Sequence, residues 1–159
     1  MEYTPDVTQP DKVETAVNNG TEVQVKDAYN NVRRSKPMEA MTKPEVLEDN
    51  TVYPDYNGTF LPIGGINEML HPEMFEQGIF RQGQLSVVGE EELLKRKVTL
   101  LRVDLLSGKR GDCQKFWIDN ETGIVLKTEI YKKDKVMQSM AFESVDFISG
   151  FNDSKFELN

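Results

Sequence analysis

The chain has 159 residues, of which 38% are hydrophobic and 29% are charged, and its net charge is −8. A chain of this length can bury a hydrophobic core without disulfide or metal cross-links. Its excess of acidic residues argues against nonspecific binding to nucleic acid or to anionic lipid. The single cysteine, Cys113, excludes an intramolecular disulfide, and no run reaches the roughly 20 apolar residues of a membrane span. The sequence therefore predicts one globular domain over residues 1–159.

The first predicted element is a β-hairpin. Apolar and polar residues alternate over 13–17 and again over 22–26, and Asn19-Gly20 lies between the two runs. An Asn-Gly pair between alternating runs is the strongest short-range hairpin signal. A turn and a short strand are predicted to follow over 27–34.

Residues 27–62 are the least regular part of the chain. Met38, Met41, Val46 and Leu47 are compatible with a short helical turn, but the surrounding prolines exclude a long helix. Beyond them, two short helices are predicted over 66–71 and 72–78, with Pro72 at the first position of the second helix and Gly78 at its end. We interpret this helix pair as a lid over the core, or alternatively as a plug over a hydrophobic cavity.

Strands are predicted for most of the second half. Short strands at 79–80 and 85–88 precede an acidic turn at Gly89–Glu92. The next strand, Val98–Leu106, places Leu101, Val103 and Leu105 on one face and charged side chains on the other, which we expect to be wet.

The most regular stretch, residues 116–131, consists of two runs of β-branched and aromatic residues joined by a polar loop that ends in Gly123. Such a loop needs a residue with positive φ, and glycine supplies it without steric cost. A turn at Lys132–Lys135 leads into a last strand predicted over Val136–Phe147, with a bulge near Ser144. Neighbouring strands joined by tight turns form an antiparallel meander, which becomes a core when one face is covered.

No catalytic, metal or cofactor site is predicted. One His and one Cys cannot form a usual zinc site, and Asp119–Gly123 lacks the spacing of a calcium loop. The run Glu90–Glu92 is interpreted as a solvated turn; an enzyme would need carboxylates converging from Glu90, Glu91 or Glu121. Trp117 faces away from Phe116 and is either a partner contact at a rim or a side chain buried under a loop.

Three segments of the second half resemble the amino-terminal domain of the RseB/MucB sigma-factor regulators. They are Leu85–Glu91, Arg96–Val98 and Phe116–Lys127, which match a V-G-E strand end, a basic G-R turn and a W-x-D-x-E-T-G-L-x-L-K run. Lys95 stands where the glycine of that turn would be. The closing segments 145–147 and 150–158 are similar to the tail of LolA-like lipoprotein carriers and spore lipoproteins.

The resemblance implies a mainly β (α+β) fold, in which short helices cover the concave face of a strongly curved antiparallel sheet that does not close into a barrel. It also implies that the chain lacks the family's opening helix and first strands. Members of these families bind lipoprotein acyl chains or protein partners in the periplasm or cell envelope, so the resemblance implies a protein that is not an enzyme. We therefore expect an extracytoplasmic domain, membrane-tethered in the full-length protein, that binds a protein partner or an acyl chain. The alternative is a structural envelope or spore lipoprotein domain that binds a protein and no lipid.

The candidate ligand or partner surface consists of the apolar residues of the predicted helices and of the inward faces of the strands: Ile66, Met69, Leu70, Met74, Phe75, Leu101, Val103, Phe116, Ile118, Met140 and Phe142. An abbreviated sheet would leave an unpaired edge, which a second copy could cover by strand addition. We therefore also expect a homodimer through residues 1–35. No nucleic-acid partner is expected.

Overall fold

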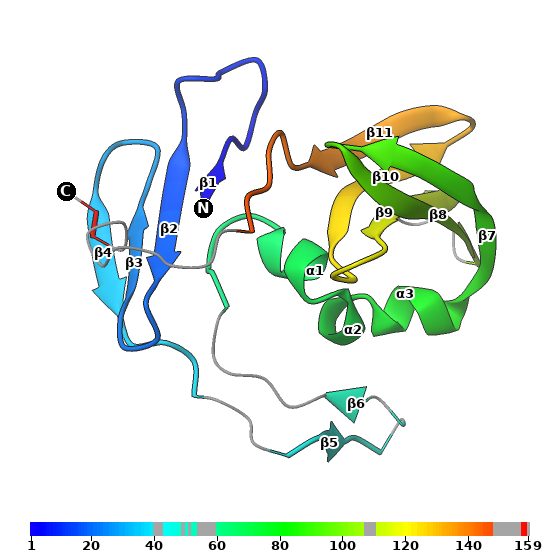
Figure 1. Ribbon diagram of the computed structural model, residues 1–159, viewed down its shortest axis with the longest axis horizontal. Coiled ribbons are helices and arrows are strands. Elements are labelled where there is room, and N and C mark those ends of the chain that lie inside the picture. Colours follow the sequence, from blue (N-terminus) through cyan, green and yellow to red (C-terminus); the bar gives the residue numbers. More distant parts are fainter. Residues whose placement is uncertain are drawn as a thin grey trace. The chain divides into compact units, whose positions relative to one another are not determined.

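Figure 1 shows the computed structural model, which describes residues 1–39, 43–48, 50, 52–53, 60–106, 111–147 and 157–158. The chain divides into two compact units, one formed by Met1–Asn67 with Phe147–Asn159 and the other by Glu68–Asp146. Each unit contains an antiparallel sheet, and neither sheet closes into a barrel within the described residues. The predicted fold class, mainly β with a few short helices, is confirmed.

The first unit contains a four-stranded sheet in the order β1-β2-β3-β4, formed by Glu2–Tyr3, Glu14–Asn18, Val23–Lys26 and Val32–Ser35. The predicted hairpin is its centre, with Asn18 paired to Val23 and Gly20 at a φ of +87°. The Asn19 side chain accepts hydrogen bonds from the backbone N–H groups of Thr21 and Glu22, at 2.9 and 2.8 Å. The expected dimer through residues 1–35 stays a prediction.

The helical turn predicted around Val46 is wrong. Glu45–Val46 forms strand β5, which pairs with β6, Val52–Tyr53, and Val46 lies opposite Val52. Two β-branched residues facing each other across a short hairpin favour the extended backbone. Met41, which was assigned to the same turn, lies outside the described residues.

Three short helices follow, namely α1 (Ile66–Leu70), α2 (Pro72–Phe75) and α3 (Gln77–Gln82). Pro72 begins α2 as predicted, but Gly78 does not end the helical region, and Ile79–Phe80 is helical rather than extended. The Phe80 ring packs against Phe116 with 5.2 Å between ring centroids, so packing overrides the strand propensity of these residues. Of the helices that the structure describes, none combines the length and apolarity needed to cross a membrane.

The second unit is built on a five-stranded meander in the order β11-β10-β9-β8-β7. Its strands are β7 (Gly83–Leu93), β8 (Arg96–Leu105), β9 (Cys113–Asp119), β10 (Val125–Lys132) and β11 (Lys135–Ala141). Figure 1 shows the sheet strongly curved and open. We call the face that carries Leu101, Val103, Phe116 and Thr128 the inner face, because Met69, Ile79 and Phe80 of the helices pack against it; the opposite face is the outer face.

The predicted acidic turn at Gly89–Glu92 is also wrong. Strand β7 continues through it, and the turn lies at Leu94-Lys95, whose φ angles are +53° and +62°. Glu92 pairs with Lys97, and opposite charges facing each other across a ladder stabilise the strand. Lys95 thus adopts a backbone conformation that favours glycine, at the position where the resembling family has glycine.

The last strand is shorter than predicted, because β11 ends at Ala141. The irregularity in its pairing lies opposite Ile130-Tyr131, between Val136 and Gln138, and not near Ser144. The two-residue turn at Lys133-Asp134 fixes the pair Lys132–Lys135. The extra residue of β11, Met137, therefore forms a bulge immediately after this turn. Val136 is consequently exposed.

Buried residues cover both faces of the sheet. The inner cluster consists of Met69, Val103, Phe116 and Val125, and the outer cluster of Val98, Leu100, Trp117 and Leu126. The outer face is therefore wet at one end only, where Arg102 and Asp104 form a 2.7 Å ion pair. At the other end, partly buried Leu93, Ile124 and Val145 pack over the outer cluster.

Replacing Gly123 by valine should lower the free energy of unfolding by about 1–3 kcal/mol, because its φ of +76° is unfavourable for a β-branched residue. An added Cβ meets no atom within 4 Å at this position, so backbone strain is the expected cause. Gly89→Val is the matched control, since its added Cβ also meets open space and its φ is not in the left-handed region. Equal urea midpoints for the two variants would contradict the prediction.

Candidate functional site

The predicted apolar surface is mostly a packed core. Met69, Val103 and Phe116 are almost fully buried, and four other predicted residues pack around them while partly buried: Leu101, Ile118, Met140 and Phe142. The structure therefore brings seven of the predicted residues together in one cluster of the second unit.

The remaining predicted residues lie elsewhere or are not described. Ile66 is buried in the first unit, and Leu70 is half-buried. The side chains of Met74 and Phe75 lie outside the described part of the structure. A role for this surface in ligand or partner binding stays a prediction.

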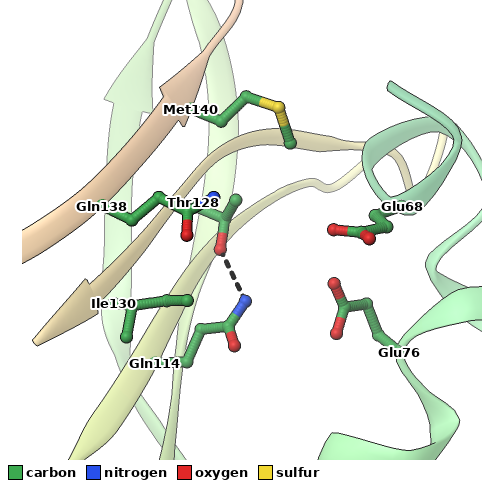
Figure 2. Close-up of a pocket in the computed structure, with 7 residues that line it drawn as sticks. All are labelled: Glu68, Glu76, Gln114, Thr128, Ile130, Gln138 and Met140. Atoms are coloured by element: carbon green, nitrogen blue, oxygen red, sulfur yellow. Dashed lines mark hydrogen bonds between the residues drawn. The ribbon is translucent and has the colours of Figure 1, made fainter. Parts of the chain in front are cut away.

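A cavity of about 210 Å³ lies on the inner face, between the helices and the sheet. Figure 2 shows carboxylates from the helices pointing across it toward polar side chains of the strands. The described residues that line it are Glu68, Glu76, Gln114, Thr128, Ile130, Gln138 and Met140. The inner face thus has an apolar part that the helices fill and a polar part that they leave hollow.

The buried end of this cavity is formed by Glu76 and Gln114, which are 3% and 4% exposed, together with Thr128. The Gln114 Nε2 group donates to the Thr128 hydroxyl at 3.0 Å. The Gln114 Oε1 atom is buried and accepts no hydrogen bond from any described residue. Glu68 and Gln138 are exposed, so they form the mouth of the cavity.

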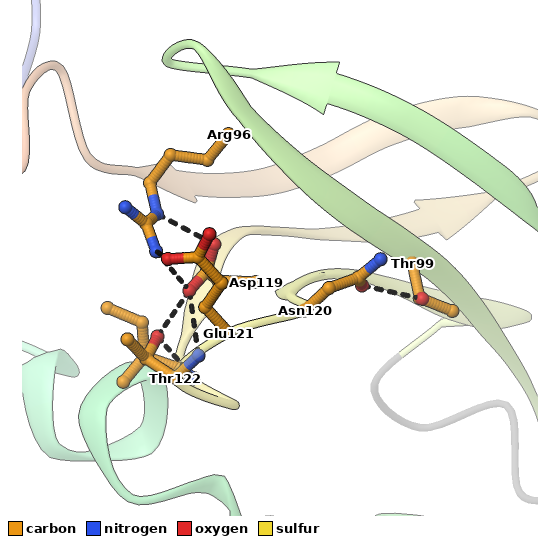
Figure 3. A network of polar contacts seen from close by, with 7 residues as sticks. Arg96, Thr99, Asp119, Asn120, Glu121 and Thr122 are labelled. Atoms are coloured by element: carbon orange, nitrogen blue, oxygen red, sulfur yellow. Dashed lines mark hydrogen bonds and ion pairs between the residues drawn. The ribbon is translucent and has the colours of Figure 1, made fainter.

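A polar network at the end of the sheet links the β7–β8 turn to the β9–β10 turn (Figure 3). The Asp119 carboxylate, 1% exposed, accepts hydrogen bonds from Arg96 Nε at 2.7 Å and from Arg96 Nη2 at 3.0 Å. It also accepts from the backbone N–H and the hydroxyl of Thr122, at 2.9 and 2.5 Å. Because Arg96 and Thr122 donate to the charged form, the pKa of Asp119 is lowered from 3.8 to about 2.

The outer face carries a second network around Trp117. The indole Nε1 donates to Glu91 at 2.9 Å, and the Lys127 ammonium lies 4.5 Å from the ring centroid. Lys127 also pairs with Glu129 at 2.8 Å, and the Tyr131 hydroxyl donates to Glu129, which raises the pKa of Tyr131 to about 12. Trp117 is therefore buried, as one of the two interpretations of its position predicted.

The single cysteine and the single histidine belong to different parts of the second unit. Cys113 is buried in β9, and His71 Nδ1 lies 3.4 Å from a Glu73 carboxylate oxygen. No group of three His, Cys, Asp or Glu side chains that could hold a metal ion occurs in the part of the chain that the structure describes.

No protein-family model and no curated protein sequence matches the chain. In fold it is similar to the structure of the MucA/MucB complex of Pseudomonas aeruginosa, with a TM-score of 0.51, 13% sequence identity, and coverage of 92% of this chain and 50% of that one. The chain has a MucB-like fold. This confirms the fold that the resemblance of residues 85–127 implied.

Two further solved structures are similar at lower scores. A crystal structure of MucB has a TM-score of 0.48 at 12% identity, with 92% of this chain and 56% of that chain covered. A putative outer membrane lipoprotein-sorting protein domain from Vibrio parahaemolyticus has a TM-score of 0.38 at 13% identity, with 95% and 56% covered. The chain spans about half the length of the structures it matches.

Within this MucB-like fold, sequence reasoning included Met140 but missed the other described residues that line the cavity. Gln114 shares the inward parity of Phe116 and Ile118, and Thr128 shares that of Ile130. A polar residue at an inward position of an apolar strand is the signal that could have indicated them. Glu68 and Glu76 gave no comparable signal, because acidic residues on short helices are usually solvated.

Proposed function

We propose that this chain is a non-enzymatic binding domain that works outside the cytoplasmic membrane and acts by binding a protein partner. We favour a protein over an acyl chain as the ligand because the inner face is already filled by side chains of this chain. Met69, Phe80 and Phe116 pack together and fill the apolar part of the inner face between the helices and the sheet.

The remaining cavity is poorly suited to a lipid tail. Five of its seven lining residues are polar or acidic, and its volume is about 210 Å³. Placing hydrocarbon against Glu76 and Gln114 would remove water from polar groups without replacing their hydrogen bonds, which is unfavourable. A protein, which can offer donors and acceptors, fits this lining better.

The fold and the sequence resemblance support the same proposal. The structure in which the similar fold occurs is a complex of MucB with the protein MucA. The resemblance of residues 85–127 to the RseB/MucB regulators supports a location in the periplasm or cell envelope.

Chemical cross-linking in envelope extracts, followed by titration of the purified candidate partner, tests this proposal. We expect saturable binding of a protein, and no saturable binding of a fluorescent long-chain fatty acid or of a triacylated lipopeptide. Stoichiometric lipid binding without any protein partner would overturn the proposal.

One observation favours the competing function of an acyl-chain carrier. Leu85 and Val87 of the edge strand β7 share the inner face with Leu101 and Val103 but are exposed. An acyl chain would have to lie along this strip. If a lipid does bind, Val87→Asp should abolish its binding. Val136→Asp, at an exposed valine of the opposite edge strand β11, is the matched control and should leave lipid binding unchanged.

A further inference from the structure

The polar cavity on the inner face has a definite chemical preference. Its described lining offers the carboxylates of Glu68 and Glu76, the amide oxygen of Gln114 and the hydroxyl of Thr128, and it includes no Lys, Arg or His. A lining of this composition attracts positive charge and accepts hydrogen bonds.

We propose that this cavity binds the cationic end of a lysine or arginine side chain of the protein partner. The inference rests on the proposed function and names the chemistry of the contact. An ammonium or guanidinium group carries several N–H donors and no acceptor, so it can donate hydrogen bonds to the oxygens of this lining.

Gln114 is the residue that points most directly to a ligand. Its Nε2 group is used by Thr128, whereas its Oε1 atom is buried and receives no donor from the described residues. A buried acceptor without a donor destabilises the folded chain, and in native proteins such an atom usually has a partner. Figure 2 shows this amide directed into the cavity, across from the Glu76 carboxylate.

The shape of the cavity suits the end of a long side chain. It has an exposed mouth at Glu68 and Gln138 and a buried floor at Glu76, Gln114 and Thr128. At roughly 30 Å³ of liquid volume per water, its 210 Å³ is several times the volume of one water molecule. Ile130 and Met140 provide apolar wall for the methylene groups of such a side chain.

A divalent metal ion is a weaker candidate for this cavity. Calcium takes six to eight oxygen ligands, usually with several carboxylates, whereas the described lining provides only two carboxylates.

The net charge of the chain, −8, also favours a basic partner, because it would accelerate the approach of a positively charged segment.

NMR titration with Nα-acetyl-lysine methylamide tests the inference, with the norleucine analogue, which lacks the ammonium group, as the matched probe. We expect saturable shifts of the Gln114 side-chain amide and of Ile130 with the lysine probe and none with norleucine. Glu68→Gln and Glu76→Gln should each weaken binding about tenfold, the effect of one lost charge-assisted hydrogen bond. Glu92→Gln, an exposed acid on β7, is the control variant and should bind normally.

Glu68 is exposed, so Glu68→Gln keeps the test valid if the buried Glu76→Gln variant fails to fold. Equal shifts with norleucine, or saturable shifts with calcium chloride in place of the lysine probe, would overturn the inference. A partner that binds Glu68→Gln and wild-type protein equally would overturn it while leaving the proposed function standing. A bound lysine probe without any protein partner would support the site and count against the proposed function.

Discussion

Replacing Phe116 by alanine is expected to lower the free energy of unfolding by about 3–5 kcal/mol, the usual cost of truncating a buried phenylalanine. Phe116 is 1% exposed and packs in one cluster with Met69 and Val103, and its ring contacts Phe80 of α3. The truncation would leave a cavity between the sheet and the helices, because strands paired on both sides of β9 prevent the backbone from closing in.

Urea unfolding followed by tryptophan fluorescence measures this effect. Trp117 is the single tryptophan and lies in the outer cluster of the same sheet, so its emission reports the unfolding of this unit. Val87→Ala is the control, since Val87 lies on the same face but is 70% exposed, and it should change stability by less than about 0.5 kcal/mol. Unchanged stability of Phe116→Ala with loss of partner binding would instead restore Phe116 to the ligand surface.

Replacing Asp119 by asparagine is expected to lower the free energy of unfolding by about 2–3 kcal/mol, the range for losing charge-assisted hydrogen bonds to a buried group. Asp119 Oδ2 accepts from Arg96 Nη2 and from both donors of Thr122. In Asp119→Asn, an amide NH₂ group at the Oδ2 position could not accept these hydrogen bonds. If the amide oxygen took that position instead, the NH₂ group would face the Arg96 Nε donor.

The same carboxylate predicts a dependence of stability on pH. The pKa of Asp119 is lowered in the folded chain from 3.8 to about 2, so the unfolded chain binds its proton first as the pH falls. The stabilisation is complete above about pH 4 and is lost between about pH 4 and pH 2. The difference in stability between wild type and Asp119→Asn should therefore shrink over this window.

Glu121→Gln is the matched control for both measurements. Glu121 contacts the same guanidinium, with 2.8 Å between Arg96 Nη2 and Glu121 Oε2, but its side chain is 81% exposed. An exposed ion pair contributes little, so this variant should stay close to wild type. If Glu121→Gln destabilised the chain as strongly as Asp119→Asn, burial of the carboxylate would not be the cause.

The sequence by itself determined the central strands of the meander and the turns on either side of β10, but neither the full length of β7 nor the end of β11. Alternation over 13–26 and the run 116–131 placed two hairpins, because side-chain parity and turn residues are local properties. The resemblance of Phe116–Lys127 to the RseB/MucB regulators also indicated the MucB-like fold.

Tertiary structure decided the rest, because it depended on what each segment packs against. Ile79-Phe80 is helical since Phe80 fills the space over Phe116, and the acidic run at 90–92 is extended since β8 supplies its partners. The cavity itself joins Glu68 of α1 and Glu76, which lies between α2 and α3, to Gln114 of β9. No local pattern brings those three residues together; only the closing of the helices onto the inner face does, and it covers the apolar half while leaving the polar half open.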